Sequence, residues 1–70
     1  MIPLDLAVVG EENIIRRVGG NPEMKKHLED MSFIAGSAVT VISTINGNLI
    51  VKIKESRVAI SKEMAAKIMV

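Results

Sequence analysis

The stretch HLEDMSFIAGSAVTVI, residues 27–42, contains the change from helix to strand on which the predicted fold depends. Its first residues end a helical pattern, SFIAG interrupts that pattern, and AVTVI then alternates so that Val39 and Val41 share one face of a strand. The stretch shows no obvious catalytic residue. We therefore expect a structural role, in which a helix ends, a short turn reaches Gly36 and a strand begins.

A helix is predicted over residues 22–31, across the start of this stretch. Asn21 is a favourable N-cap, and Pro22 fits the first helical position because its missing N–H would have no partner there. Glu23 follows in the first turn, where the helix dipole favours a negative charge. Positions i, i+3, i+4 and i+7 then form one stripe, which consists of Met24, His27, Leu28 and Met31.

The other segments predict short strands joined by tight turns. NIIRRV, residues 13–18, is rich in β-branched residues and is closed by Gly19-Gly20, which predicts one strand running into a turn. Asn46-Gly47 lies between two alternating runs and indicates a type I′ hairpin, because both central positions of that turn need positive φ. In the following strand Ile50 would face outward. The core-facing positions of that strand would be Leu49, Val51 and Ile53.

The C-terminal third predicts a second reversal at KESR (54–57) and a further strand at RVAI (57–60). Ser61 can cap a short helical turn, and IMV (68–70) ends the chain as a last strand. Together these elements predict a mainly β fold in one domain, residues 1–70. We expect a small SH3-like barrel of about five strands with an inserted α-helix and a short C-terminal helical turn.

Composition limits the function classes. There is no Cys, which excludes disulfides and thiolate chemistry and fits a reducing compartment, so we expect the cytoplasm. No apolar run approaches the roughly 20 residues of a membrane helix. The formal net charge is +1, and the basic C-terminal third has no interleaved aromatic residues, so nucleic acid is not an expected partner. The weaker alternative of nucleic-acid binding by this third would show steep salt dependence.

Candidate chemistry is sparse, and we do not expect an enzyme. His27 is the only imidazole, and its place on the helix stripe predicts a half-buried packing residue rather than a ligand. Glu23 and His27, four residues apart, could hold a divalent metal ion weakly with water, but the same spacing is an ordinary helix pair. The methionines lie at apolar-periodic positions, where core filling explains them better than thioether ligation.

The opening stretch resembles a segment of the FeoA family, basic-Leu-x-x-[Leu/Met]-Gly-[Phe/Leu/Ile]-x-Pro-Gly-x-x-Val-x-Val. The matching positions are Leu28, Met31, Phe33, Gly36, Val39 and Val41. The similarity extends upstream through Gly10, Ile15, Val18 and Gly20, and downstream through Ala59, Ile60, Ala65, Ile68 and Val70. Three positions depart from the family pattern. Ser32 and Glu55 replace turn glycines and Ala35 replaces a proline, and the changes at Ser32 and Ala35 are expected to loosen the turn that opens the core strand.

This resemblance implies an SH3-like barrel that acts as an accessory to FeoB, the membrane ferrous-iron transporter with a G-protein domain, without chemistry or a required cofactor. Partner contact is expected at an apolar groove made by Met24, Leu28, Phe33 and Ile50; the alternative, that these residues only pack the helix on the barrel, stays open. A second hypothesis is a sensor of Fe(II) or another transition metal, similar to the C-terminal SH3-like domain of DtxR-type iron-dependent repressors.

Overall fold

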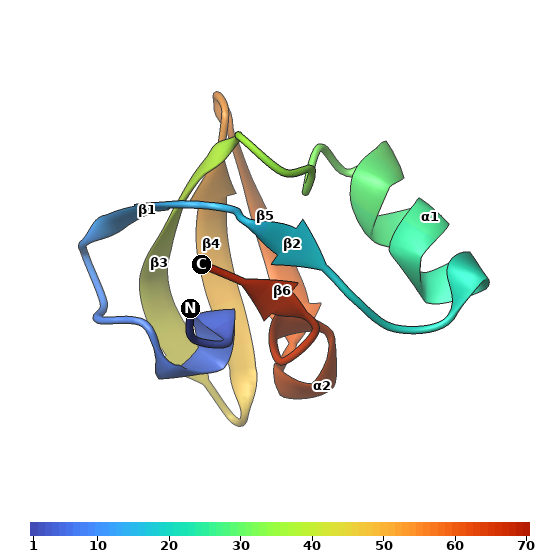
Figure 1. Cartoon of the computed structure of the whole chain (residues 1–70). Helices are drawn as coiled ribbons and strands as arrows, with labels where there is room; N and C mark the ends of the chain where they lie inside the picture. Colours follow the sequence, from blue (N-terminus) through green and yellow to red (C-terminus); the bar gives the residue numbers. More distant parts are fainter.

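The computed structural model describes all 70 residues and shows a mainly β architecture (Figure 1). Four strands form one sheet in the order β1-β3-β4-β5, and β2 and β6 form a second, two-stranded sheet. A 3-10 turn precedes the strands, and two α-helices interrupt them. The elements in chain order are η1 (Leu4–Leu6), β1 (Glu12–Ile14), β2 (Arg17–Val18), α1 (Pro22–Asp30), β3 (Ala38–Ile45), β4 (Asn48–Ile53), β5 (Ser56–Ser61), α2 (Lys62–Ala65) and β6 (Ile68–Met69).

The centre of the large sheet is the predicted hairpin. Asn46 and Gly47 join β3 to β4 with φ of 49° and 81°, the two positive values that a type I′ turn requires. Val41 pairs with Val51 across this hairpin, and the alternating side chains of β4 are buried as expected. In the next turn the positive φ falls on Lys54, at 54°, and not on Glu55. The left-handed residue of this turn is therefore Lys54, one residue before Glu55, which stands where the family pattern has a glycine.

Residues 13–18 do not form one strand, which corrects the prediction from the sequence. β1 pairs with β3, whereas β2 pairs with β6, so the chain passes from one sheet to the other at Ile15 and Arg16. The Ile15 N–H donates to Ser37 O at 2.8 Å, and the Arg16 N–H donates to Met69 O at 2.8 Å. Ile15 and Val18 are both buried although they are three residues apart, which a regular strand does not allow. The split gives six strands where about five were predicted, and it joins the two sheets.

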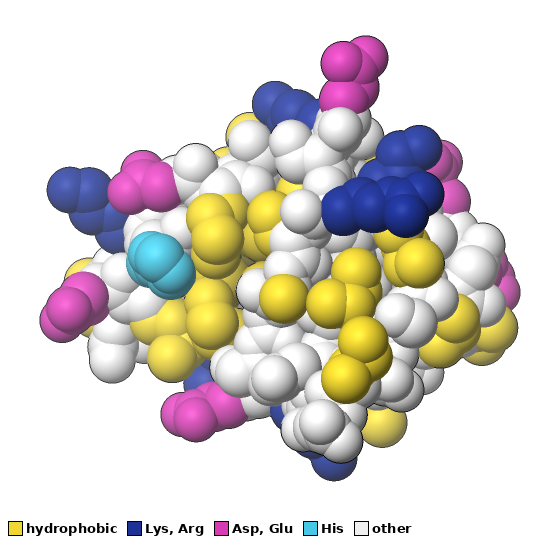
Figure 2. Space-filling model, turned by 180° about the vertical axis from the view of Figure 1, so that it is seen from behind, with side chains coloured by type: hydrophobic (Ala, Val, Ile, Leu, Met, Phe, Trp, Pro, Cys, Tyr) yellow, Lys and Arg dark blue, Asp and Glu magenta, His cyan; other side chains and the backbone are white.

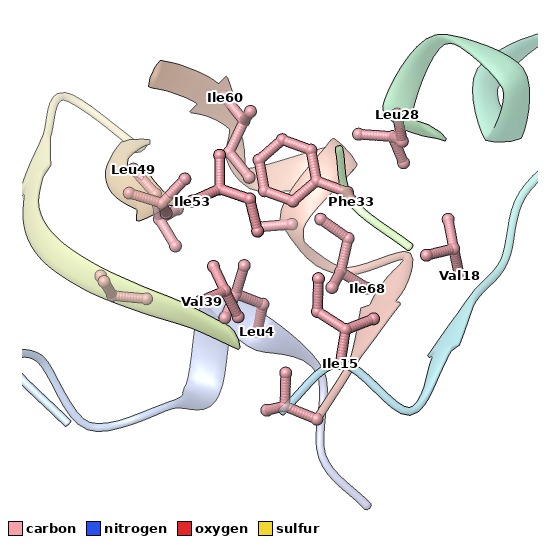
Figure 3. Packing of buried hydrophobic residues seen from close by; sticks show 14 residues of the cluster. Leu4, Ile15, Val18, Leu28, Phe33, Val39, Leu49, Ile53, Ile60 and Ile68 are labelled. Atoms are coloured by element: carbon pink, nitrogen blue, oxygen red, sulfur yellow. The ribbon is translucent and has the colours of Figure 1, made fainter. Parts of the chain in front are cut away.

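The stretch after α1 ends the helix in a Schellman motif. The Ser32 N–H donates to Glu29 O at 2.9 Å and the Phe33 N–H donates to Leu28 O at 3.0 Å, with Ser32 at a φ of 74°. Ser32 thus adopts the left-handed conformation for which the family pattern has a glycine at this position. The motif turns Phe33 into the core, where Leu28 reaches the same cluster from α1 (Figure 3).

One hydrophobic cluster of 14 residues fills the interior, and nearly every element contributes to it. Phe33, the only aromatic residue, has no exposed surface. Near the two chain ends, the Ile2 N–H donates to Val70 O and the Val70 N–H donates to Ile2 O, both at 2.8 Å. Pro3 also forms a bridge with Met69, so the N-terminal segment and β6 are joined beside the core. Helix α1 lies at one side of this barrel (Figure 1).

Candidate functional site

Helix α1 begins where the sequence predicts, and its first turn places Met24. The Asn21 side-chain oxygen accepts a hydrogen bond from the Met24 N–H at 2.8 Å, and Pro22 occupies the first helical turn. Gly20, with a φ of 95°, precedes this cap, and a Cβ at Gly20 would lie 3.2 Å from the Met24 sulfur. The glycine therefore provides both the backbone turn and the space that the Met24 side chain uses.

Helix α2 is a single turn, and it places Met64. The Ser61 hydroxyl accepts a hydrogen bond from the Met64 N–H at 3.1 Å, as the sequence predicts for a cap at this position. Ala65 faces the core with no exposed surface, while Met64 is half-buried and packs against the edge of the core. The thioether of Met64 is therefore held next to the barrel and remains accessible.

Between the two helices lies a groove of about 470 Å³, which we call the α1–α2 groove. It is lined by Asn21, Glu23, Met24, His27 and Met64. In the space-filling view the imidazole, coloured cyan, lies beside a group of hydrophobic side chains (Figure 2). Leu28 is the only fully buried residue of α1. Met24, on the same helix, and Met31, just after it, are partly buried beside Leu28. The helix thus presents most of its surface outward, and the groove opens along its inner edge.

The structure separates the four residues predicted to contact a partner. Met24 is half-buried and lines the groove. Leu28 and Phe33 have 0% exposed surface, so they cannot contact a partner in this conformation, and their inclusion in a surface groove is corrected. They pack α1 and the following turn onto the barrel. Ile50 faces outward on β4, where it pairs with Ser43 and Ala59, and it does not line the groove.

Glu23 and His27 are brought to the same groove, on the same helix. His27 is exposed, which corrects the expectation of a half-buried packing residue; its side of the helix lies at the rim of the groove rather than against the core. No group of three or more His, Cys, Asp and Glu side chains in the chain is placed to hold a metal ion. Two donors are fewer than the nitrogen and oxygen ligands that protein sites supply for Fe(II) or Zn²⁺. The set therefore does not fit such an ion.

Met64 is the groove residue that the sequence prediction missed. The sequence predicts the short helix and its Ser61 cap, but Met64 was assigned to the core together with the other methionines. The direction in which a one-turn helix presents its side chains depends on how the barrel closes between β5 and β6. The only available signal was the pair of capped helical turns, each with a methionine three residues after its capping residue.

A barrel of six short strands with a helix inserted between β2 and β3 has the SH3-like architecture, and comparisons with known proteins agree on this fold. Residues 2–70 match the profile of the FeoA domain. A curated protein of Methanocaldococcus jannaschii, named as a candidate Fe(2+) transport protein A, is 37% identical over 70 residues, which cover 100% of this chain and 85% of that protein. The chain belongs to the FeoA family, whose members are associated with ferrous iron transport.

Solved structures show the same fold at low sequence identity. FeoA of Stenotrophomonas maltophilia complexed with zinc, described as a prokaryotic SH3 domain protein, superposes with a TM-score of 0.85 at 16% identity and covers 99% of this chain and 88% of that one. A manganese-dependent transcriptional repressor superposes with a TM-score of 0.85 at 19% identity, over 94% of this chain and 38% of the repressor. Neither helix of the present structure has the length and apolar character of a membrane span.

Proposed function

We propose that this chain is a non-catalytic cytoplasmic accessory protein of ferrous iron uptake, which binds the cytoplasmic G-protein domain of a FeoB-like transporter through the α1–α2 groove. The observation that carries the proposal is the groove itself. Two half-buried methionines from different helices, Met24 and Met64, line an open volume of about 470 Å³ beside an exposed helix. Methionine-lined surfaces suit the binding of apolar side chains because the flexible thioether adapts to irregular shapes.

The way α1 is held supports a binding role for its inner edge. Leu28 fixes the helix to the core, and the Asn21 cap fixes its first turn, so the backbone of the groove wall is defined before a partner arrives. Binding to a preformed groove avoids much of the entropy cost of ordering a loop. The family membership of the chain supports a transporter as partner, and the preformed groove supports this surface as the place of contact.

The proposal is tested by titrating ¹⁵N-labelled protein with the G-protein domain of a FeoB transporter. We expect chemical shift changes at Met24, His27 and Met64. Met24→Gln and Met64→Gln keep side-chain length but make the groove polar, and each should weaken binding at least about tenfold, since losing the apolar end of a buried methionine costs about 1.5–2 kcal/mol. The matched control is Ile14→Gln, on exposed β1 away from the groove, which should bind as the parent does.

Two results would contradict this role. One is an unchanged spectrum at high concentrations of both proteins. The other is a set of shifts centred on the outer face of β4, around Ile50, with the groove residues unaffected.

Sensing of Fe(II) is the less well supported alternative. It rests on Glu23 and His27, which share the groove, but the chain adds no third nitrogen or oxygen ligand of the acidic or imidazole type. An anaerobic titration with Fe(II) decides it, because shifts at His27 and Glu23 without the transporter would favour sensing. An unchanged spectrum would leave the accessory role as the remaining function.

A further inference from the structure

The α1–α2 groove brings together a set of donor atoms that neither helix carries alone. Met24 and His27 are three residues apart on α1, and Met64 lines the groove from α2. The set contains one imidazole and two thioethers, with Glu23 as the only carboxylate at the groove. Nitrogen and oxygen donors alone are too few for Fe(II) or Zn²⁺, so the chemistry of the site depends on its two sulfur atoms.

We propose that the α1–α2 groove binds one soft monovalent metal ion, Cu(I) or its analogue Ag(I), through an imidazole nitrogen of His27 and the sulfur atoms of Met24 and Met64. Thioethers are soft ligands that prefer Cu(I) over the harder divalent ions, and imidazole accompanies them in many copper sites. Two sulfur atoms and one nitrogen satisfy the low coordination number of such an ion. The argument for this site does not rest on a transporter docking at the same groove.

The two methionines are held in a way that suits ligation. Each donates its backbone N–H to the cap of its own helix, Met24 to Asn21 at 2.8 Å and Met64 to Ser61 at 3.1 Å. Their backbones are therefore fixed on the two sides of the groove, and an unbranched side chain with three torsions can adapt the position of its sulfur to a shared ion. Gly20 leaves the space that the Met24 sulfur occupies.

The charges around the groove favour a cation here over the other methionine pair of the chain. Glu23 is the only acidic side chain that lines the α1–α2 groove, and no Lys or Arg lines it. Met1 and Met69 line a different cavity of about 310 Å³, but Arg17 and Lys67 line it too. Two positive charges at short range oppose cation binding, so the second pair is a natural internal comparison.

The test is a titration of the metal-free protein with Ag(I), which has no redox chemistry under these conditions, followed by NMR of ¹³C-methyl methionine and of the histidine ring. One equivalent should shift the methyl signals of Met24 and Met64 and the ring signals of His27. The methyl signals of Met1, Met31 and Met69 should stay in place. A competition with a coloured Cu(I) chelator under anaerobic conditions should then show binding of one Cu(I) per chain.

Variants separate ligation from packing. The Ag(I) affinity should fall at least about tenfold in each of three variants, Met24→Leu, Met64→Leu and His27→Gln. Even residues that only hydrogen-bond to a metal ligand change metal affinity by about that factor when they are replaced. The matched control Met31→Leu removes a thioether that packs on the core outside the groove, and it should change the affinity less than about twofold. Backbone spectra of the metal-free variants show whether each one is folded.

Three outcomes would overturn the proposal. They are no shift at stoichiometric Ag(I), shifts at Met1 and Met69 in place of the groove methionines, and a loss of Ag(I) affinity in Met31→Leu as large as in the groove variants. Because the transporter titration uses metal-free protein, failure here leaves that result untouched. Failure of the transporter titration likewise leaves the metal site standing.

Discussion

Ser32 shows how a single backbone conformation connects helix to barrel. It has a φ of 74°, and the hydrogen bonds on either side of it close the end of α1 and direct Phe33 into the core. A non-glycine residue in the left-handed region costs roughly 1–2 kcal/mol. The native hydrogen bonds and the burial of Phe33 outweigh that cost, so the fold keeps the turn in spite of the serine.

Ser32→Gly should therefore stabilise the protein. Relief of the left-handed strain exceeds the entropy of about 0.4–1 kcal/mol that glycine adds to the unfolded chain, so we expect a net gain of about 0.5–1 kcal/mol. For a domain of this size the gain corresponds to a rise in Tm of about 2–8 °C, measurable by circular dichroism. Ser56→Gly is the control, because Ser56 begins β5 without positive φ and should gain nothing. Equal or lower stability of Ser32→Gly would show that the turn is not strained.

At the scale of elements, the sequence predicted the turns, helix caps and strand alternation that depend on neighbouring residues. The Asn46-Gly47 hairpin, the Asn21 and Ser61 caps, and the alternation of β4 were all predicted correctly, because each depends on residues close in sequence. The split of residues 13–18 was not predicted, because it depends on hydrogen bonds to Ser37 and Met69, far along the chain. The adjacent Arg16 and Arg17 between two buried residues interrupt the alternation and were the available sign of the split.

The same distinction applies to the candidate site. Met24 was predicted because the cap and the stripe of α1 are local features. Leu28 and Phe33 were predicted as candidates for a surface groove, with packing on the barrel as the open alternative, because the sequence does not show how closely the end of α1 approaches the core. Met64 was missed since its direction follows from the closure of the barrel, which involves residues from both ends of the chain.

Removal of the Asn21 cap tests how far α1 depends on its own local signals. Asn21→Ala deletes the acceptor for the Met24 N–H and should lower the free energy of unfolding by about 1 kcal/mol. Asn21→Ser restores an acceptor at the same position and should recover most of the loss. Urea denaturation measures both variants, and an alanine variant as stable as the parent would mean that the cap bond makes no net contribution.

At the scale of the whole molecule, the barrel and α1 differ in how they are held. The strands share one core and are joined beside it by the pairing of Ile2 with Val70, whereas α1 contributes only Leu28 as a buried residue. An element with few buried apolar contacts can open without global unfolding. The groove wall on α1 is thus attached less firmly than the wall on α2, which stays with the barrel.

Leu28→Ala separates these two levels of stability. Truncating a fully buried leucine costs about 2–5 kcal/mol, and most of that cost should fall on the attachment of α1, because Leu28 is its one fully buried residue. In the parent protein, native-state hydrogen exchange should be faster at the amides of α1 than at those of Val41 and Val51. The variant should widen this difference, and binding at the α1–α2 groove should weaken with it. If α1 and the central hairpin instead exchanged at one common rate in both proteins, helix and barrel would form a single cooperative unit, and separate opening of α1 would be excluded.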